Sequence, residues 1–199
     1  MRTRFVGIAL TTLLLMASAY ADAVFTLGNH PQPGEQNIMF HTAMTGTMVS
    51  GTTNQTHNQV VFLSNQTLHV SGGQSDVDAV SGSLTNITIT APLFVFNDYI
   101  LNPFKDTSSS NISVMVVMSD GHTFSFGPYG KNGDNFLTIT TSGGEEIAKI
   151  LVTAAGGGVT GLKQNRISGV IPIPESSSLL LLGGGLIGLA GIVGRKRRA

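Results

Sequence analysis

The string Gly156-Gly157-Gly158-Val159-Thr160-Gly161 has the spacing Gly-x-Gly-x-x-Gly, in which a glycine loop and a helix start cradle a dinucleotide pyrophosphate. That chemistry also needs a helix that opens on the last glycine and an acidic residue about 20 positions further on. Here Pro172 follows 11 residues after Gly161, and the stretch between them has the pattern of a strand. We therefore interpret these glycines as a loop and expect no nucleotide cofactor.

Oxygen-bearing side chains that could hold a cation occur at two places. Asp76 and Asp78 could offer two carboxylates on one side of a strand or loop, and residues 132–135 (Asn-Gly-Asp-Asn) are rich in oxygen ligands for calcium. Neither place has a 12-residue loop that ends in a bidentate Glu, and both have the composition of turns. No two histidines have the i, i+4 spacing of helical zinc ligands; they are His30, His41, His57, His69 and His122. We expect turns here and no metal site, with structural calcium as the alternative.

Hydrolytic chemistry has little support in the sequence. Glu145 and Glu146 are adjacent and would point to opposite sides of a strand, which is a poor arrangement for an acid/base pair. No Gly-x-Ser-x-Gly nucleophile elbow occurs. The chain contains no cysteine, which excludes disulfides and thiolate metal sites. We therefore predict no catalytic residues and no enzyme.

The body that would carry any site is residues 24–170, which is long enough for one domain with its own core. It contains five cations and nine acids, a formal charge of −4, and the cations are dispersed, so nucleic acid is not an expected partner. Many Thr, Ser, Asn and Gly residues present neutral hydrogen-bonding groups that would suit a hydrated polysaccharide. Aromatic platforms for sugars are few, because Trp is absent and Tyr99 and Tyr129 are expected in loops. Carbohydrate binding is thus a hypothesis.

Alternating apolar and polar residues predict strands in most of this body. In residues 84–90, Ile87 and Ile89 share one face, and residues 111–119 are apolar on both faces, as in a central strand. Asp-Gly at 120–121 predicts a tight hairpin into residues 122–126, where Phe124 and Phe126 would face the core. Gly143-Gly144 predicts a second hairpin that joins residues 135–141 to 146–153.

Further strands are expected in six other segments, which are 24–27, 38–44, 59–63, 67–70, 93–96 and 165–168. About ten short strands with Gly, Asn and Ser turns are typical of an all-β protein. We predict an antiparallel β-sandwich or jelly-roll-like domain, with additional segments at both ends of the chain.

The N-terminal segment has the pattern of a secretory signal peptide. Arg2 and Arg4 precede an apolar run from 6 to 16, and small residues follow from 17 to 23. The run spans 11 residues, whereas about 20 are needed to cross a bilayer as a helix. We predict that residues 1–23 form a signal peptide, with cleavage before Tyr20, Asp22 or Val24. An uncleaved anchor is the alternative.

The C-terminal segment, residues 171–199, has the pattern of a membrane anchor. It begins with Pro172, Ile173, Pro174 and Glu175 and continues as an unbroken apolar run of 15 residues from 179 to 193. A helix over 176–194 would be roughly 28 Å long, which just spans a bilayer. The run ends in a basic cluster of Arg195, Lys196, Arg197 and Arg198, which resists translocation and would hold the C-terminus in the cytoplasm.

Three types of tail share an apolar C-terminal run. A plain single-span anchor explains the run and the basic stop, and Gly184 and Gly188 could pack such helices together. A glycosylphosphatidylinositol signal does not need a basic stop, so the cluster argues against it. In a processing signal, the extended Pro-Glu segment is presented to a protease or transpeptidase outside the membrane. The plain anchor and the processing signal both remain open on these physical grounds.

Pro174-Glu175, the following serines, the Leu/Gly-rich run and the basic end together resemble the PEP-CTERM sorting domain, over about residues 171–199. The family's motif is Pro-Glu-Pro, and here the third position is Ser176. Residues 133–139, 144–147 and 162–170 also resemble closing strands of other small proteins with this tail, which implies a β-sandwich surface protein. The resemblance implies recognition by the bacterial membrane enzyme exosortase, and Pro174, Glu175 and Ser176 would be the processing motif.

These observations together predict an exported, non-enzymatic protein of the cell surface or extracellular matrix. Its expected partners are the secretion machinery, the membrane and exosortase, and the resemblance adds exopolysaccharide. The alternative is a carbohydrate-binding module on a plain single-span membrane anchor.

Overall fold

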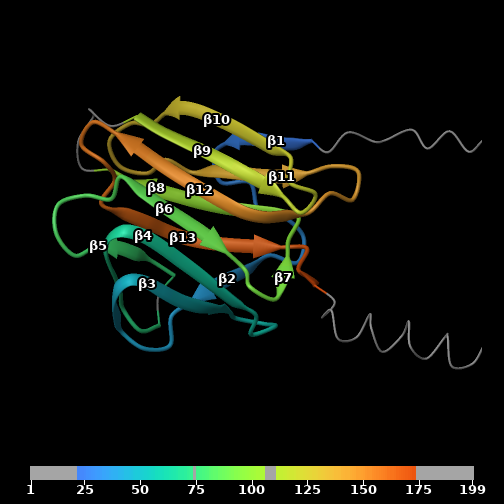
Figure 1. Ribbon diagram of the computed structural model, residues 1–199, viewed down its shortest axis with the longest axis horizontal. Coiled ribbons are helices and arrows are strands. Elements are labelled where there is room, and N and C mark those ends of the chain that lie inside the picture. The colour runs from blue at the N-terminus through green and yellow to red at the C-terminus, as the bar shows by residue number, and fades with distance from the viewer. Residues whose placement is uncertain (1–21, 74, 106–110, 174–199) are drawn as a thin grey trace, which may run out of the picture.

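The computed structural model describes residues 22–73, 75–105 and 111–173, and these residues form fourteen β-strands and no helix (Figure 1). The first seven strands are β1 (Ala23–Leu27), β2 (Gln36–Met39), β3 (Met44–Thr53), β4 (Gln59–Val70), β5 (Val77–Ala79), β6 (Asn86–Thr90) and β7 (Phe94–Val95). The others are β8 (Asp98–Phe104), β9 (Asn111–Met118), β10 (Thr123–Tyr129), β11 (Leu137–Thr141), β12 (Ile147–Ala155), β13 (Gly161–Ser168) and β14 (Ile171–Pro172).

Twelve of the strands belong to one antiparallel sheet. Its order is β1-β11-β8-β13-β2-β3-β4-β6-β12-β9-β10, and β5 pairs with both β13 and β4. Because β5 bridges these two strands, β13, β2, β3, β4 and β5 form a closed five-stranded ring from which the remaining strands extend. The prediction of an antiparallel all-β body is confirmed. Its connectivity differs from that of a sandwich of two separate sheets, since hydrogen bonds run continuously from β1 to β10.

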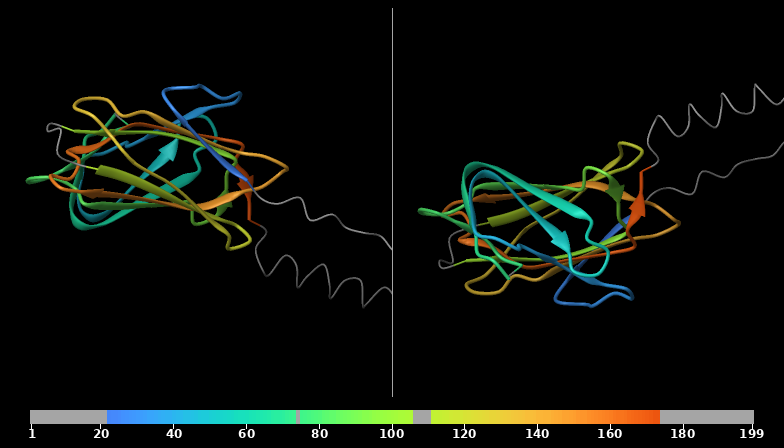
Figure 2. Two further views of the ribbon diagram at one scale, coloured as in Figure 1. Left: turned by 90° about the horizontal axis from the view of Figure 1, so that it is seen from above. Right: turned by 90° about the horizontal axis from the view of Figure 1, so that it is seen from below.

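The sheet folds back on itself so that its two arms face each other across the core (Figure 2). One arm contains β1, β11, β8 and β13, and the other contains β6, β12, β9 and β10. Fully buried side chains from both arms fill the space between them, such as Tyr99 on β8 and Ile150 on β12. Among the described residues no ladder joins β1 to β10, but Phe25 and Phe126 stack with ring centroids 5.4 Å apart. Hydrogen bonds of β5 to β13 and β4 therefore close the sheet at the ring, and aromatic packing between β1 and β10 closes it where the two arms end.

The strands of the second arm agree closely with the alternation in the sequence. Ile87 and Ile89 of β6 are both buried, and every second residue of β9 is buried. The predicted hairpin at 120–121 joins β9 to β10, with Gly121 at a φ of 93° and the Met118 amide donating to the His122 carbonyl at 2.9 Å. Phe124 and Phe126 are partly buried and pack against the core, as predicted.

The predicted hairpin at Gly143-Gly144 is wrong. A turn does occur there, but β11 pairs with β1 and β8, whereas β12 pairs with β6 and β9. The turn therefore carries the chain from one arm of the sheet to the other. Its geometry is fixed by the Glu145 carbonyl, which accepts hydrogen bonds from the Thr141 hydroxyl at 2.7 Å and the Asn97 amide at 2.7 Å.

The glycines of the Gly-x-Gly-x-x-Gly string form a turn and the start of β13, so their interpretation as a loop is confirmed. Gly161 pairs with Asp78 of β5. A Cβ at Gly161 would lie 2.6 Å from the Val77 carbonyl oxygen, which is closer than carbon and oxygen can approach. This glycine is therefore required for β5 to reach β13 and close the ring.

Candidate functional site

The predicted sorting motif, Pro174, Glu175 and Ser176, and the predicted membrane stop, Arg195, Lys196, Arg197 and Arg198, lie outside the described residues. The predicted span over 176–194 and most of the signal peptide also lie outside them. Within the described ranges, no helix is long and apolar enough to cross a membrane. The last described residue, Ile173, donates its amide to the Leu93 carbonyl at 2.9 Å, directly after β14 pairs with β7.

An open groove of about 590 Å³ lies where the ends of β1 and β10 meet the start of β11. Its lining combines apolar, aromatic and charged residues, which are Leu27, Gly28, Tyr129, Gly130, Lys131, Asp134, Asn135 and Phe136. Tyr129 packs on Phe126 with ring centroids 5.5 Å apart, and its hydroxyl is buried without a partner among the described residues. Burial raises the pKa of this phenol, so it stays protonated. Lys131 and Asp134 are the exposed charges of the groove.

Asn135 explains the composition of residues 132–135. Its buried side-chain amide donates to the carbonyls of Lys131, Gly133 and Pro103 at 2.8, 2.9 and 3.1 Å, and its oxygen accepts the Lys131 amide at 2.6 Å. Asn102 accepts the Asn135 backbone amide and donates to Asp134. These bonds are internal to the protein, as the turn interpretation expects.

Asp76 and Asp78 also act within the fold. The Asp76 carboxylate accepts the Gln164 backbone amide at 3.1 Å, and Asp78 lies on β5 beside Gly161 of β13. Partial burial, and then the charge of Asp76, raises the pKa of Asp78, while Lys163 and His69 act in the opposite direction. Among the described residues, no three His, Asp or Glu side chains are grouped in a way that could hold a metal ion.

Four of the five histidines make side-chain hydrogen bonds to nearby groups, and these are His30, His41, His69 and His122. On the exposed surface, His41 forms a hydrogen bond with the Thr52 hydroxyl at 2.8 Å, and His69 forms one with the Thr45 hydroxyl at 3.1 Å. His122 lies 2.6 Å from the Asp120 carboxylate at the tip of the β9–β10 hairpin. This hydrogen bond and the charge of Asp120 raise the pKa of His122. The pKa of Asp120 is lowered first by the His122 backbone amide, which donates to its carboxylate at 2.9 Å, and then by the His122 side chain.

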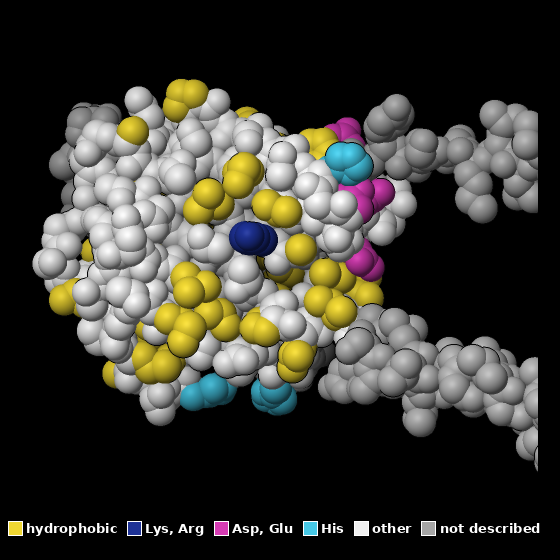
Figure 3. Space-filling model, in the orientation of Figure 1, with side chains coloured by type: hydrophobic (Ala, Val, Ile, Leu, Met, Phe, Trp, Pro, Cys, Tyr) yellow, Lys and Arg dark blue, Asp and Glu magenta, His cyan; other side chains and the backbone are white. Residues whose placement is uncertain are grey.

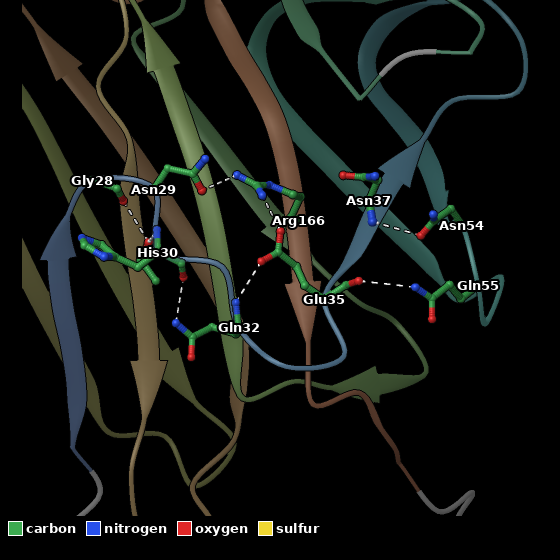
Figure 4. Close-up of polar contacts among 10 residues, drawn as sticks. Gly28, Asn29, His30, Gln32, Glu35, Asn37, Asn54, Gln55 and Arg166 are labelled. Atoms are coloured by element: carbon green, nitrogen blue, oxygen red, sulfur yellow. Dashed lines mark hydrogen bonds and ion pairs between the residues drawn. The ribbon is translucent and has the colours of Figure 1, made fainter.

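A polar network holds the loop between β1 and β2 against β13 (Figure 4). Arg166 of β13 contacts Glu35 at 2.6 Å and donates to Asn29 at 2.5 Å, with both charged side chains mostly shielded from solvent. The second oxygen of Glu35 accepts the Gln32 amide at 3.0 Å. Because each charge is already paired, we interpret the network as a fastening for the loop and not as a ligand site.

The outward surface of β3, β4, β6, β12, β9 and β10 carries two rows of aliphatic and hydroxyl side chains, which we call the mixed face. Figure 3 shows hydrophobic side chains gathered over these strands. Strand register places one row through Met48, Leu63, Thr88, Leu151, Met115 and Ser125, and the other through Ser50, Val61, Thr90, Lys149, Val117 and Thr123. The mixed face has one cation and no acid. It was not predicted from the sequence, although alternation in each strand indicates which residues point outward.

The expectation that Tyr99 and Tyr129 lie in loops is wrong. Tyr99 lies on β8, is fully buried, and donates its hydroxyl to the Asn165 side chain at 3.2 Å. Burial raises its pKa well above the ordinary range. Tyr129 lies on β10 and contributes to the groove. Of these two tyrosines, only Tyr129 can contact a ligand in the groove.

Comparison with known proteins identifies no family for this chain. No protein-family profile and no curated protein matches it. Among solved structures, the enzymatically active domain of tailspike protein 4 of bacteriophage CBA120 is similar at a TM-score of 0.25 and 16% identity, over 77% of this chain and 19% of the tailspike chain. The chain thus spans about a fifth of the length of that protein, and a likeness this distant supports no inference about activity.

Proposed function

We propose that the chain is an exported, non-enzymatic surface protein whose β-rich body is held outside the cytoplasm by a C-terminal PEP-CTERM sorting tail. The sequence from Pro174 to Arg198 carries this proposal. An apolar run of sufficient length followed by four basic residues orients the tail with its end in the cytoplasm. The body is then on the other side, and Pro174-Glu175-Ser176 lies beside it as the motif for exosortase.

The start of β1 supports cleavage of the signal peptide before Asp22. Ala23 is buried and pairs with Thr141, and the Asp22 carbonyl accepts the Ser142 amide at 3.2 Å. Cleavage before Val24 would remove both residues from the edge of the sheet. Cleavage after Ala21 keeps them and leaves small residues, Ala19 and Ala21, at the positions that signal peptidase requires.

The surface of the body supports a role in contact with hydrated polymer. The mixed face presents hydroxyl and aliphatic groups in regular rows with a single cation, Lys149. Neutral hydroxyls can exchange hydrogen bonds with polymer hydroxyls, and the aliphatic groups between them exclude water. We assign association with extracellular polysaccharide to this face.

Topology is directly testable because the chain contains no cysteine. Thr153→Cys places a thiol on the exposed surface of β12, and Ala199→Cys places one after the basic end. In intact cells without exosortase, which retain the end of the tail, a membrane-impermeant maleimide should label the first variant and not the second. Labelling of both without permeabilisation, or of neither, would contradict the proposed orientation. Permeabilised cells provide the control that both thiols can react.

The groove favours a second candidate function, a carbohydrate-binding module on a plain membrane anchor. The groove combines an aromatic ring, Tyr129, with the exposed polar groups of Lys131 and Asp134, which is the chemistry that sugars use for stacking and hydrogen bonding. Retention of residues 22–173 on a polysaccharide, lost in Lys131→Ala but kept in Lys163→Ala, would support it. Lack of retention on a panel of neutral and acidic polysaccharides would exclude it.

A further inference from the structure

Three exposed apolar side chains surround the point where the described chain ends. Leu93 is 68% exposed, Ile171 39% and Ile173 48%. They are neighbours because β14 pairs with β7 through Ile171 and Val95, and the Ile173 amide donates to the Leu93 carbonyl. We call these three residues the exit patch.

The exit patch continues into an apolar groove of about 450 Å³. Its lining is mostly apolar and consists of Val95, Ser119, Glu146, Ala148, Ile171, Pro172 and Ile173. The start of β1 and the end of β14 leave the body at the same end of the molecule (Figures 1 and 2). In Figure 3, hydrophobic side chains reach the right-hand edge of the body.

The sequence after Ile173 limits how far the exit patch can be from a membrane. If the tail spans the bilayer from Ser176, as the proposed function has it, only Pro174 and Glu175 separate that point from Ile173. Three residue steps cover at most roughly 10 Å even when fully extended. The headgroup region on each side of the hydrocarbon core is about 5–8 Å thick. Ile173, which is hydrogen-bonded to the body, must therefore lie in or at the edge of the headgroup layer.

We propose that the exit patch rests on the lipid bilayer, with Leu93, Ile171 and Ile173 inserted among the headgroups, so that the body is seated on the membrane instead of hanging free on its tail. This inference rests on the proposed membrane tail. Apolar side chains exposed at the level of the headgroups gain by moving toward the acyl chains. The hydrogen bonds of β14 to β7 make the patch rigid, so the short link fixes its position.

The acidic groups near the exit patch indicate which lipids it prefers. Glu146 is one of the residues that line the apolar groove. The Ser119 amide donates to the Glu146 carbonyl, which brings Asp120, next in the chain, close to the groove. Anionic headgroups repel such carboxylates over about a Debye length. The exit patch should therefore insert more deeply into zwitterionic lipid than into anionic lipid.

Site-specific quenching in vesicles tests the inference with the full chain. Single cysteines labelled with an environment-sensitive dye are placed at Ser119, beside the patch, at Val80, and at Ile187 in the predicted span. Val80 is 51% exposed and directly follows β5. β5 pairs with the start of β13, whereas the exit patch lies beyond the end of β13. The two ends of β13 are about 24 Å apart. The vesicles are phosphatidylcholine with a quencher either near the headgroups or deep in the acyl chains.

We expect strong quenching at Ile187 by the deep quencher, and at least twofold more quenching at Ser119 than at Val80 by the shallow one. Leu93→Asn should reduce the Ser119 signal at least twofold, whereas Leu27→Asn, a matched change at another exposed leucine, should not. Adding phosphatidylglycerol should also reduce it.

Two outcomes overturn the inference in distinguishable ways. Quenching at Ile187 together with equal, weak quenching at Ser119 and Val80 means that the tail spans the membrane but the body does not rest on it. Absence of quenching at Ile187 means that the tail does not span the membrane, and the inference then fails together with the proposed membrane tail. A Ser119 signal that depends on protein concentration at fixed lipid indicates contact between copies, which also contradicts a lipid seat.

Discussion

Replacing Asn135 with Asp would invert the hydrogen bonding at the centre of the 131–135 turn. The Asn135 amide nitrogen donates to three carbonyl oxygens at 2.8–3.1 Å in a side chain that is 6% exposed. A carboxylate donates nothing at neutral pH, so those three carbonyls would face a negative oxygen. The shape of the side chain hardly changes, which makes Asn135→Asp a test of chemistry rather than of packing.

The expected loss of stability follows from these contacts. The two amide hydrogens serve three acceptors, so we count two hydrogen bonds at about 1 kcal/mol each. A further cost of about 1–3 kcal/mol arises because a poorly paired carboxylate is buried. The free energy of unfolding should therefore fall by about 3–5 kcal/mol, which for a body of this size lowers Tm by roughly 10 °C. Burial raises the carboxyl pKa of the variant, so the loss should shrink as the pH falls and the carboxyl group is protonated.

Urea unfolding of residues 22–173 measures the loss of stability. Because the chain has no Trp, unfolding is monitored by far-ultraviolet circular dichroism. Asp134→Asn is the control, because Asp134 is exposed and the new amide oxygen can still accept the bond from Asn102; it should change stability by less than about 1 kcal/mol. A calcium site at residues 132–135 makes the opposite prediction, since an added carboxylate would strengthen it. Stability of Asn135→Asp equal to that of the wild type, or its recovery in millimolar calcium, would refute the turn interpretation.

Other perturbations test the ring and the exposed charges. Gly161→Ala should destabilise the body by about 1–3 kcal/mol because its Cβ overlaps the β5 backbone, whereas Gly46→Ala, with its nearest contact at 3.4 Å, should be nearly neutral; urea midpoints compare them. Asp78 has a raised pKa, so its ionisation opposes folding and the protein loses stability as the pH rises through that pKa. Asp78→Asn should therefore be more stable than the wild type at pH 7 but not at pH 3, and equal effects at both would contradict this. In NMR titrations, the pKa of His122 should lie above its ordinary value of about 6.5 and fall in Asp120→Asn.

Local structure was largely predictable from the sequence because strand alternation and tight turns are encoded by neighbouring residues. The buried pair Ile87 and Ile89, and the Asp-Gly turn at 120–121, illustrate this. Segments 59–63 and 67–70, expected as two strands, form the single strand β4, because Ser64, Asn65 and Gln66 find partners on β6 and the segment before it. In the sequence, these three polar residues inside a long strand have the composition of a turn, so one strand was predicted as two.

Long-range connections were not predictable in this way. Gly143-Gly144 satisfies the requirements of a turn whether the flanking strands pair with each other or lie in opposite arms, so the sequence could not distinguish a hairpin from a crossover. The closure of the ring depends on three residues of β5, too few to show a period. The mixed face and the groove likewise combine residues from strands far apart in the chain, whereas the tail motif is contiguous and was accessible to sequence reasoning alone.

Intact mass of the mature protein from its native host, with and without exosortase, tests the proposed sorting tail most directly. We predict a chain that begins at Asp22 in both cases. With exosortase it should lack the apolar run and the basic end, and without exosortase it should extend to Ala199. A mature chain that ends at Ala199 in both hosts would contradict processing and leave a plain membrane anchor.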